Sequence, residues 1–110
     1  MKFIIRPTAR EDILRQCRYY LVEQDAEDAA ERFLEAIQAA IKQLCKHPGI
    51  GTPKALQNPA LAGLRSWPVK GFSAIRVYYL TSEKMLRIVR VLHGKRDINP
   101  MLEDESMDYE

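Results

Sequence analysis

Apolar residues recur at helical spacing in the first half of the chain, and β-branched runs dominate the second half. Phe3-Ile4-Ile5 is a short apolar run ended by Arg6-Pro7, which predicts a first strand leading into a turn. Thr8 and Glu11 have the spacing of a capping box, so we predict that a helix of roughly four turns begins there. Its apolar positions are Ile13, Cys17, Tyr20 and Leu21.

A second helix is predicted after Asp25, whose carboxylate suits an N-cap position. It should end at Lys46-His47-Pro48, because proline cannot continue a helix and His47 can meet the last carbonyl groups. The link around Glu23-Gln24 is so short that the two helices should fold back as an antiparallel hairpin. The apolar face of this helix consists of Ala26, Ala30, Phe33, Ile37, Ala40, Ile41 and Leu44.

The second half of the chain is predicted to be a β-sheet. Residues 48–63 hold three prolines and three glycines, which is typical of a connecting loop. The predicted fold class is α+β in the order β-α-α-β-β-β, with the helical hairpin packed on one face of a mainly antiparallel sheet. We expect a single domain over residues 1–100. Its last three strands are predicted at Leu64–Val69, Ser73–Thr81 and Met85–Leu92.

Charge is distributed unevenly along the chain, although the net charge is only +2. Residues 48–100 carry nine Lys or Arg against two Asp or Glu, and residues 101–110 carry five acidic residues and no basic one. The basic part could attract an acidic protein surface or a phosphate backbone, but solvated strand edges also carry such residues. Residues 101–110 show no periodicity and are predicted to form an acidic flexible tail. It either stays a disordered solubilising tail or competes weakly with an acidic partner segment for the basic sheet face.

Length and composition exclude several classes of protein. At 110 residues the chain has room for one modest core. No apolar run approaches a membrane span or a secretory signal, so we expect a cytoplasmic protein. Cys17 and Cys45 stand alone, without a C-x-x-C spacing or a His/Cys cluster, so we expect no metal and no cofactor.

Four strings in the chain resemble those of ParE-family toxins, a branch of the RelE superfamily, over residues 2–97. The resemblance implies a bacterial type II toxin–antitoxin system with a role in plasmid stabilization. It also implies a toxin that inhibits DNA gyrase by protein binding, and a ParD-like antitoxin that wraps around it. Members of the RelE branch instead cut messenger RNA on the ribosome, and fold alone does not separate the two. The strings are His47-Pro48-Gly49-Ile50-Gly51, Leu64-Arg65-Ser66-Trp67-Pro68-Val69, Tyr79, and Ile88-Val89-Arg90-Val91-Leu92-His93-Gly94-Lys95-Arg96-Asp97.

Cutting RNA requires a base, an acid and cations around one phosphate. His93 is the candidate base, with Arg87 and Arg90 as supporting cations, and this trio is the alternative catalytic set. Strand alternation places Arg87 and His93 on one face and Arg90 on the other, unless a bulge intervenes. The constellation is incomplete, so we place a toxin without catalytic residues first and a ribosome-dependent mRNA endoribonuclease second. A third hypothesis is a non-toxic binding module.

The candidate residues for binding an antitoxin or gyrase lie in the basic half of the chain. The alternative for the arginines is a solvated sheet face with internal ion pairs, and core packing is the alternative for Trp67 and Phe72. We also expect an outer groove along the helices, where a partner helix could lie. A homodimer and a hetero-oligomer with the antitoxin both stay open, and sequence-specific nucleic-acid binding is not expected. The candidates are Arg65, Trp67, Arg76, Arg87, Arg90, Lys95 and Arg96.

Overall fold

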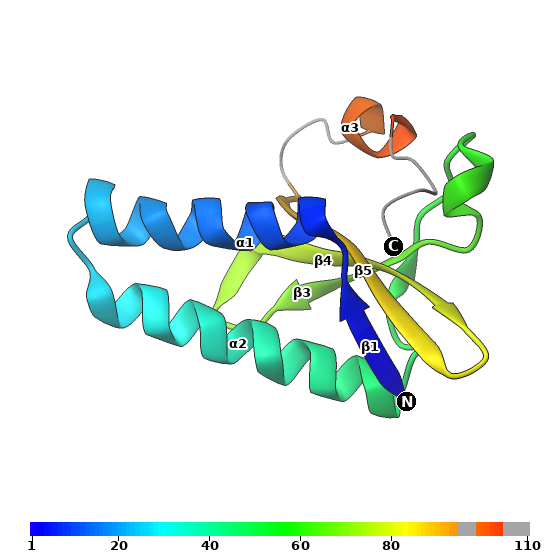
Figure 1. The fold of residues 1–110 in the computed structure, drawn as a ribbon, viewed down its shortest axis with the longest axis horizontal. Coiled ribbons are helices and arrows are strands. Elements are labelled where there is room, and N and C mark those ends of the chain that lie inside the picture. The colour runs from blue at the N-terminus through cyan, green and yellow to red at the C-terminus, as the bar shows by residue number, and fades with distance from the viewer. Residues whose placement is uncertain (95–98, 105–110) are drawn as a thin grey trace.

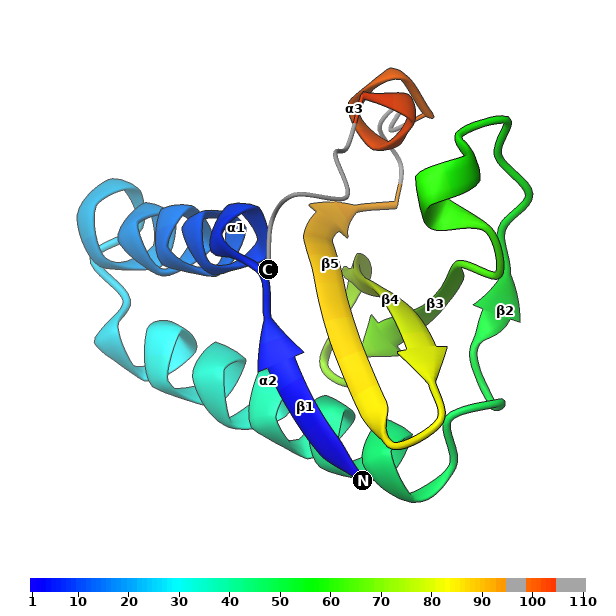
Figure 2. The same cartoon turned by 45° about the vertical axis from the view of Figure 1, so that its right-hand side comes forward.

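The computed structural model describes residues 1–94 and 99–104. Figure 1 and Figure 2 show two long helices lying together over one face of a single sheet. In this part of the chain no helix is long and apolar enough to cross a membrane. The elements are β1 (Lys2–Ile5), α1 (Pro7–Arg18), η1 (Tyr19–Glu23), α2 (Glu27–Lys46), β2 (Thr52–Pro53), η2 (Pro59–Leu61), β3 (Arg65–Val69), β4 (Phe72–Ser82), β5 (Met85–His93) and α3 (Asn99–Glu103).

The sheet has five strands in the order β1-β5-β4-β3-β2. β1 is parallel to β5, with Ile5 beside Ile88, and the other neighbouring strands are antiparallel. The predicted α+β fold is therefore confirmed, with the short edge strand β2 and the helix α3 as additions to the predicted order. Because β1 pairs with the last strand, α1 begins next to the middle of β5.

Both helices are present, but the N-caps predicted for them are wrong. α1 begins at Pro7, whose ring fixes the backbone angle that a first helical residue needs, and Arg6 precedes it without a side-chain cap. Thr8 lies inside the helix, and its buried hydroxyl oxygen has no hydrogen-bond partner among the described residues. Asp25 has a φ of 48°, in the left-handed region, so it turns the chain before Ala26, the true N-cap.

The link between the helices is a π-helical turn that extends α1 to the tip of the hairpin. The backbone N–H groups of Gln24 and Ala26 donate to the carbonyl oxygens of Tyr19 and Tyr20, at 3.3 and 2.8 Å. α2 then returns antiparallel to α1, as Figure 1 shows. The predicted helical hairpin is confirmed.

The larger core lies between the helices and the sheet. Tyr20, Phe33 and Phe72 form an aromatic cluster there, with ring centroids 5.4 to 5.8 Å apart. Phe72 and Trp67 pack against this core, in agreement with the core-packing interpretation. Burial raises the pKa of the Cys17 thiol, which therefore stays protonated at neutral pH. Other members are Ile13, Ile37, Ile41, Leu44, Val77, Tyr79, Leu86 and Ile88.

A smaller core covers the other face of the sheet, and the C-terminal helix completes it. Its buried members are Leu61, Leu64, Tyr78, Val89 and Leu102. The carboxylate of Glu103 accepts hydrogen bonds from the backbone N–H groups of Gln57 and Asn58, at 3.2 and 2.8 Å. The prediction of a free tail from Met101 onward is therefore wrong for residues 101–104, because an apolar side chain and a carboxylate anchor them. Residues 105–110 lie outside the described residues.

β5 contains a bulge where it pairs with β4. Tyr78 lies opposite Arg90, whereas Tyr79 lies opposite Ile88, so Val89 is the extra residue. One inserted residue moves every later side chain of a strand to the other face.

The bulge decides which side chains of β5 share a face. Ile88 and Val91 both belong to the core under the helices, although strict alternation would separate them. His93, two residues after Val91, therefore lies on the helix side of the sheet, and Arg87 lies on the opposite side. The prediction that Arg87 and His93 share a face is wrong for this reason.

Candidate functional site

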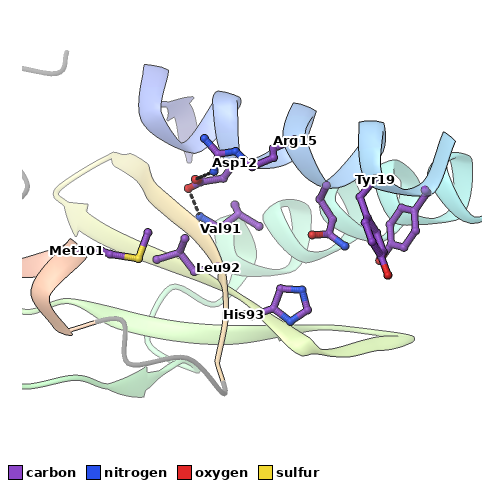
Figure 3. Close-up of a pocket in the computed structure, with 9 residues that line it drawn as sticks. Asp12, Arg15, Tyr19, Val91, Leu92, His93 and Met101 are labelled. Atoms are coloured by element: carbon purple, nitrogen blue, oxygen red, sulfur yellow. Dashed lines mark hydrogen bonds and ion pairs between the residues drawn. The ribbon is translucent and has the colours of Figure 1, made fainter. Parts of the chain in front are cut away.

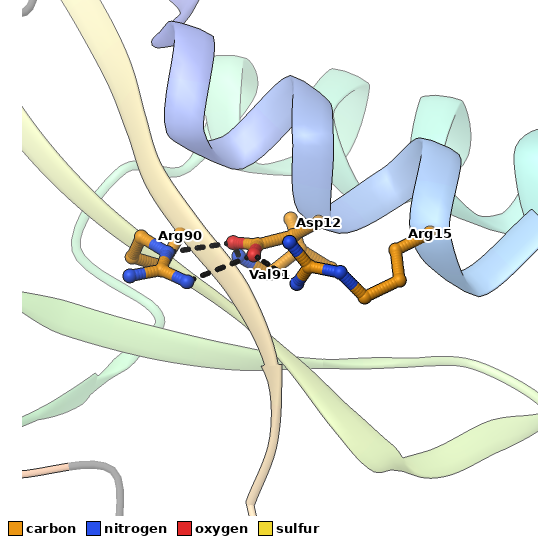
Figure 4. A network of polar contacts seen from close by, with 4 residues as sticks. All are labelled: Asp12, Arg15, Arg90 and Val91. Atoms are coloured by element: carbon orange, nitrogen blue, oxygen red, sulfur yellow. Dashed lines mark hydrogen bonds and ion pairs between the residues drawn. The ribbon is translucent and has the colours of Figure 1, made fainter. Parts of the chain in front are cut away.

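A buried ion pair joins α1 to β5, as Figure 4 shows. Arg90 donates from Nε to Oδ2 of Asp12 at 2.7 Å and from Nη2 to Oδ1 at 2.9 Å. The N–H of Val91 donates to the same Oδ2 at 3.0 Å, beyond the point where β1 pairs with β5. Arg90 is only 7% exposed, so the structure removes it from the basic surface that the sequence suggested. Its guanidinium instead neutralises a buried carboxylate, and neither charge would be stable there without the other.

Three other candidate arginines are half-buried and bind oxygen atoms of neighbouring segments. Their role in binding a partner stays a prediction, as it does for Trp67, whose side chain packs partly against the core. Lys95 and Arg96 lie outside the described residues. The bonds run from Arg65 Nη1 to the carbonyl of Gly51 (2.7 Å), from Arg76 Nε to Ser66 Oγ (2.9 Å) and from Arg87 Nη1 to Ser82 Oγ (2.8 Å).

Tyr79 explains why the loop after α2 has a glycine at position 51. The tyrosine is fully buried, and its hydroxyl accepts a hydrogen bond from the N–H of Gly51 at 2.9 Å and donates to the carbonyl of Pro48 at 2.7 Å. A side chain on Gly51 would collide with that hydroxyl. Burial raises the pKa of Tyr79, against smaller opposing effects of the Gly51 hydrogen bond and of Arg65. These residues of the resemblance therefore hold the loop against the sheet.

The two histidines lie far apart in the fold. His47 is the C-cap residue of α2, as its place at the helix end predicts. His93 lies at the end of β5 and lines a pocket beside α1, which Figure 3 shows. Because Arg87 lies on the other face and Arg90 is buried, the alternative catalytic set does not converge on one point. In residues 1–94 and 99–104, no three His, Cys, Asp or Glu side chains gather in a way that could hold a metal ion.

An apolar groove of about 690 Å³ runs between α1, α2 and the edge strand β1. Phe3, Leu14 and Leu34 are 49%, 50% and 42% exposed, although all three are large apolar side chains. Exposed apolar side chains that gather in this way are typical of surfaces that bind another protein, a ligand or a membrane. Met1, Ile5, Ile13, Ile37, Ile41 and Cys45 complete the apolar lining, and Arg10, Gln38 and Lys42 add its polar part.

The groove residues were accessible to sequence reasoning, whereas the ion pair was not. Leu14 follows Ile13 and Leu34 follows Phe33, so each helix has an apolar stripe wider than the sheet alone can cover. Asp12 gives no such signal, because its partner Arg90 lies 78 positions away in the chain.

The family model described as "ParE toxin of type II toxin-antitoxin system, parDE" matches residues 3–98. The chain belongs to the ParE toxin family. It is therefore a ParE-type toxin of a type II toxin–antitoxin system, as its motifs imply.

A solved structure described as "Chromosomal ParDE TA system from P. aeruginosa" is similar to this ParE-family toxin in fold. The TM-score is 0.67 at 17% sequence identity, over 84% of this chain and 95% of that chain. No match was found among curated proteins. The family match ends at residue 98, so the helix α3 lies beyond it.

Proposed function

We propose that this ParE-family toxin acts without catalysis, by binding DNA gyrase, and that a ParD-like antitoxin neutralises it. The proposal that the toxin acts without catalysis rests on one observation: the candidate residues for RNA cleavage lie apart in the fold. A base, an acid and cations must surround one phosphate for that reaction. His93 lies on the helix side of the sheet, Arg87 lies on the other side, and Arg90 is held by Asp12. This separation favours action by binding over RNA cleavage, and the gyrase target follows from the family resemblance.

Controlled expression of the full chain in a bacterial host tests this choice. We expect a DNA-damage response while messenger RNA stays intact. Inhibition of gyrase damages DNA, and it does not cut RNA. Cleaved messenger RNA without a DNA-damage response would reject the proposal in favour of a ribonuclease. Growth unaffected by the folded chain would support the third hypothesis, a non-toxic module.

The apolar groove supports the antitoxin half of the proposal. A partner helix laid along it would cover Phe3, Leu14 and Leu34, which are exposed in the free chain. Arg10 and Lys42 line the same groove, so a helix with acidic residues beside its apolar stripe would fit best. An antitoxin segment that folds on contact loses conformational entropy, and the buried apolar area must compensate for that loss.

Substitutions in the groove test where the antitoxin binds. Leu14→Glu and Leu34→Glu each place a charge on the apolar surface and should weaken antitoxin binding about tenfold or more. Ile50→Glu is the control, because Ile50 is also an exposed apolar residue, at 37%, but lines neither the groove nor the pocket beside α1. Binding of the purified partner can be measured by calorimetry. Equal loss in all three variants, or none in the groove variants, would show that the antitoxin binds elsewhere.

A further inference from the structure

A second pocket, of about 490 Å³, lies on the other side of α1, between that helix and the end of β5. Figure 3 shows Arg15 and Tyr19 reaching it from α1 and η1, and His93 reaching it from β5. A helix turns about 100° per residue, so positions 10, 13 and 14, which line the groove, lie opposite positions 12, 15 and 16, which line this pocket. The pocket is therefore a separate surface.

The polar groups of this pocket are mainly hydrogen-bond donors. Arg15 touches Asp12 only at 3.5 Å, and its side chain is 67% exposed, so its guanidinium can bind another anion. Within residues 1–94 and 99–104, the imidazole of His93 has no hydrogen bond or ion pair. The hydroxyl of Tyr19 accepts a bond from Gln24 Nε2 at 3.0 Å and keeps its own proton for a further acceptor.

Among the described residues that line the pocket, the one carboxylate belongs to Asp12, and it is already occupied. Both oxygens of Asp12 accept bonds from Arg90, and one also accepts the N–H of Val91. Asp12 and Arg90 cancel each other in charge, so Arg15 gives the pocket a positive surplus. An anion fits this arrangement and a cation does not.

Apart from these side chains and the amide of Gln16, the lining of the pocket is apolar, and this apolar part favours a peptide over a free ion as the ligand. Tyr20, Val91, Leu92 and Met101 line it. The adjoining tip of the hairpin also exposes apolar surface, at 44% for Tyr19, 46% for Leu21 and 70% for Val22. An inorganic anion would use none of this surface, whereas a polypeptide with an apolar residue beside its carboxylate would cover it.

We propose that this pocket binds an acidic residue of a partner polypeptide together with the apolar residue beside it. Arg15 and His93 hold the carboxylate, and Tyr20 and Met101 contact the apolar side chain. The site is independent of the groove, so one partner that passes around α1 or two different partners can occupy both. The proposal does not depend on gyrase being the target.

Two dipeptides that differ only in charge test the proposal. N-acetyl-Glu-Phe-amide and N-acetyl-Gln-Phe-amide are titrated into the ¹⁵N-labelled full-length chain, made by cell-free synthesis, and amide spectra are recorded. The Glu peptide should shift signals around Tyr19 and His93 and bind about tenfold more tightly than the Gln peptide. Arg15→Gln and His93→Gln should each weaken it severalfold. Arg18→Gln, an exposed change on the same helix outside the pocket, should not.

Three results would overturn the proposal. The first is equal binding of the two peptides, and the second is signal shifts confined to other parts of the chain. The third is inorganic phosphate binding as tightly as the Glu peptide, because the pocket would then serve small anions and the apolar lining would add nothing. Amide spectra of each variant show whether it is folded, and Arg15→Lys, which keeps the charge, should retain most of the binding.

Discussion

Replacing Asp12 by asparagine should strongly destabilise the domain, because it leaves the guanidinium of Arg90 buried without its counter-charge. The two side chains are 2% and 9% exposed. Breaking such a pair costs about 3–5 kcal/mol, a large part of the roughly 5–15 kcal/mol that holds a domain of this kind folded. At roughly 4 °C per kcal/mol, the melting temperature should fall by about 12–20 °C. Arg90→Met should cost a similar amount, since it leaves the carboxylate buried instead.

The double variant separates the interaction energy of the ion pair from the cost of changing each side chain alone. Asp12→Asn with Arg90→Met removes both charges and keeps an oxygen for the N–H of Val91, so it should cost less than the sum of the single changes by about 2 kcal/mol. Arg15→Gln is the matched control, because its contact with Asp12 is long and exposed, and its effect should stay within about 0.5 kcal/mol. Urea unfolding followed by circular dichroism gives all four free energies. Additive single effects, or a change below about 0.5 kcal/mol for Asp12→Asn, would refute the reasoning.

Five further outcomes are expected. Tyr79→Phe should cost about 1–3 kcal/mol in urea unfolding, because the buried N–H of Gly51 loses its acceptor. Since the pKa of Tyr79 is raised in the folded chain, the unfolded chain loses that proton first, so stability should fall as pH rises above about 10. The Phe variant should show a smaller fall, and equal slopes would contradict this. His93→Ala should keep toxicity in cells within a few-fold, whereas a loss of about a hundredfold in a folded variant would favour a ribonuclease. Antitoxin binding should be weaker at ~0.5 M salt than at low salt, and no difference would leave apolar burial as its sole cause. Leu102→Ala should lower the free energy of unfolding by about 2–5 kcal/mol, and a negligible effect would mean that α3 contributes little to the second core.

The order of helices and strands could be predicted because each has a periodicity of its own. Apolar residues three and four apart, such as Phe33 and Ile37, mark a buried helix face whatever lies opposite. The N-cap predictions were wrong because Pro7 and Asp25 set the chain direction by their backbone conformation, which overrides the side-chain capping motif in the sequence. Local patterns thus predict elements better than they predict element ends.

The candidate site was less predictable because it depends on contacts between distant segments. No local sequence pattern predicts the bulge at Val89, yet this single inserted residue determines the face of the sheet on which His93 lies. The burial of Arg90 depends on Asp12, and the docking of α3 depends on Glu103 reaching Asn58. A sequence shows which residues are charged, and only the fold shows which charges are already paired.

We propose that this ParE-family toxin inhibits gyrase and does not cut RNA. The most direct measurement incubates the purified full-length chain with gyrase, plasmid DNA and ATP, and in parallel with translating ribosomes and a labelled messenger RNA. We predict that gyrase loses supercoiling activity or accumulates cleaved plasmid, that the antitoxin prevents this, and that the messenger RNA stays intact. Ribosome-dependent cleavage of the messenger RNA, with gyrase unaffected, would contradict it.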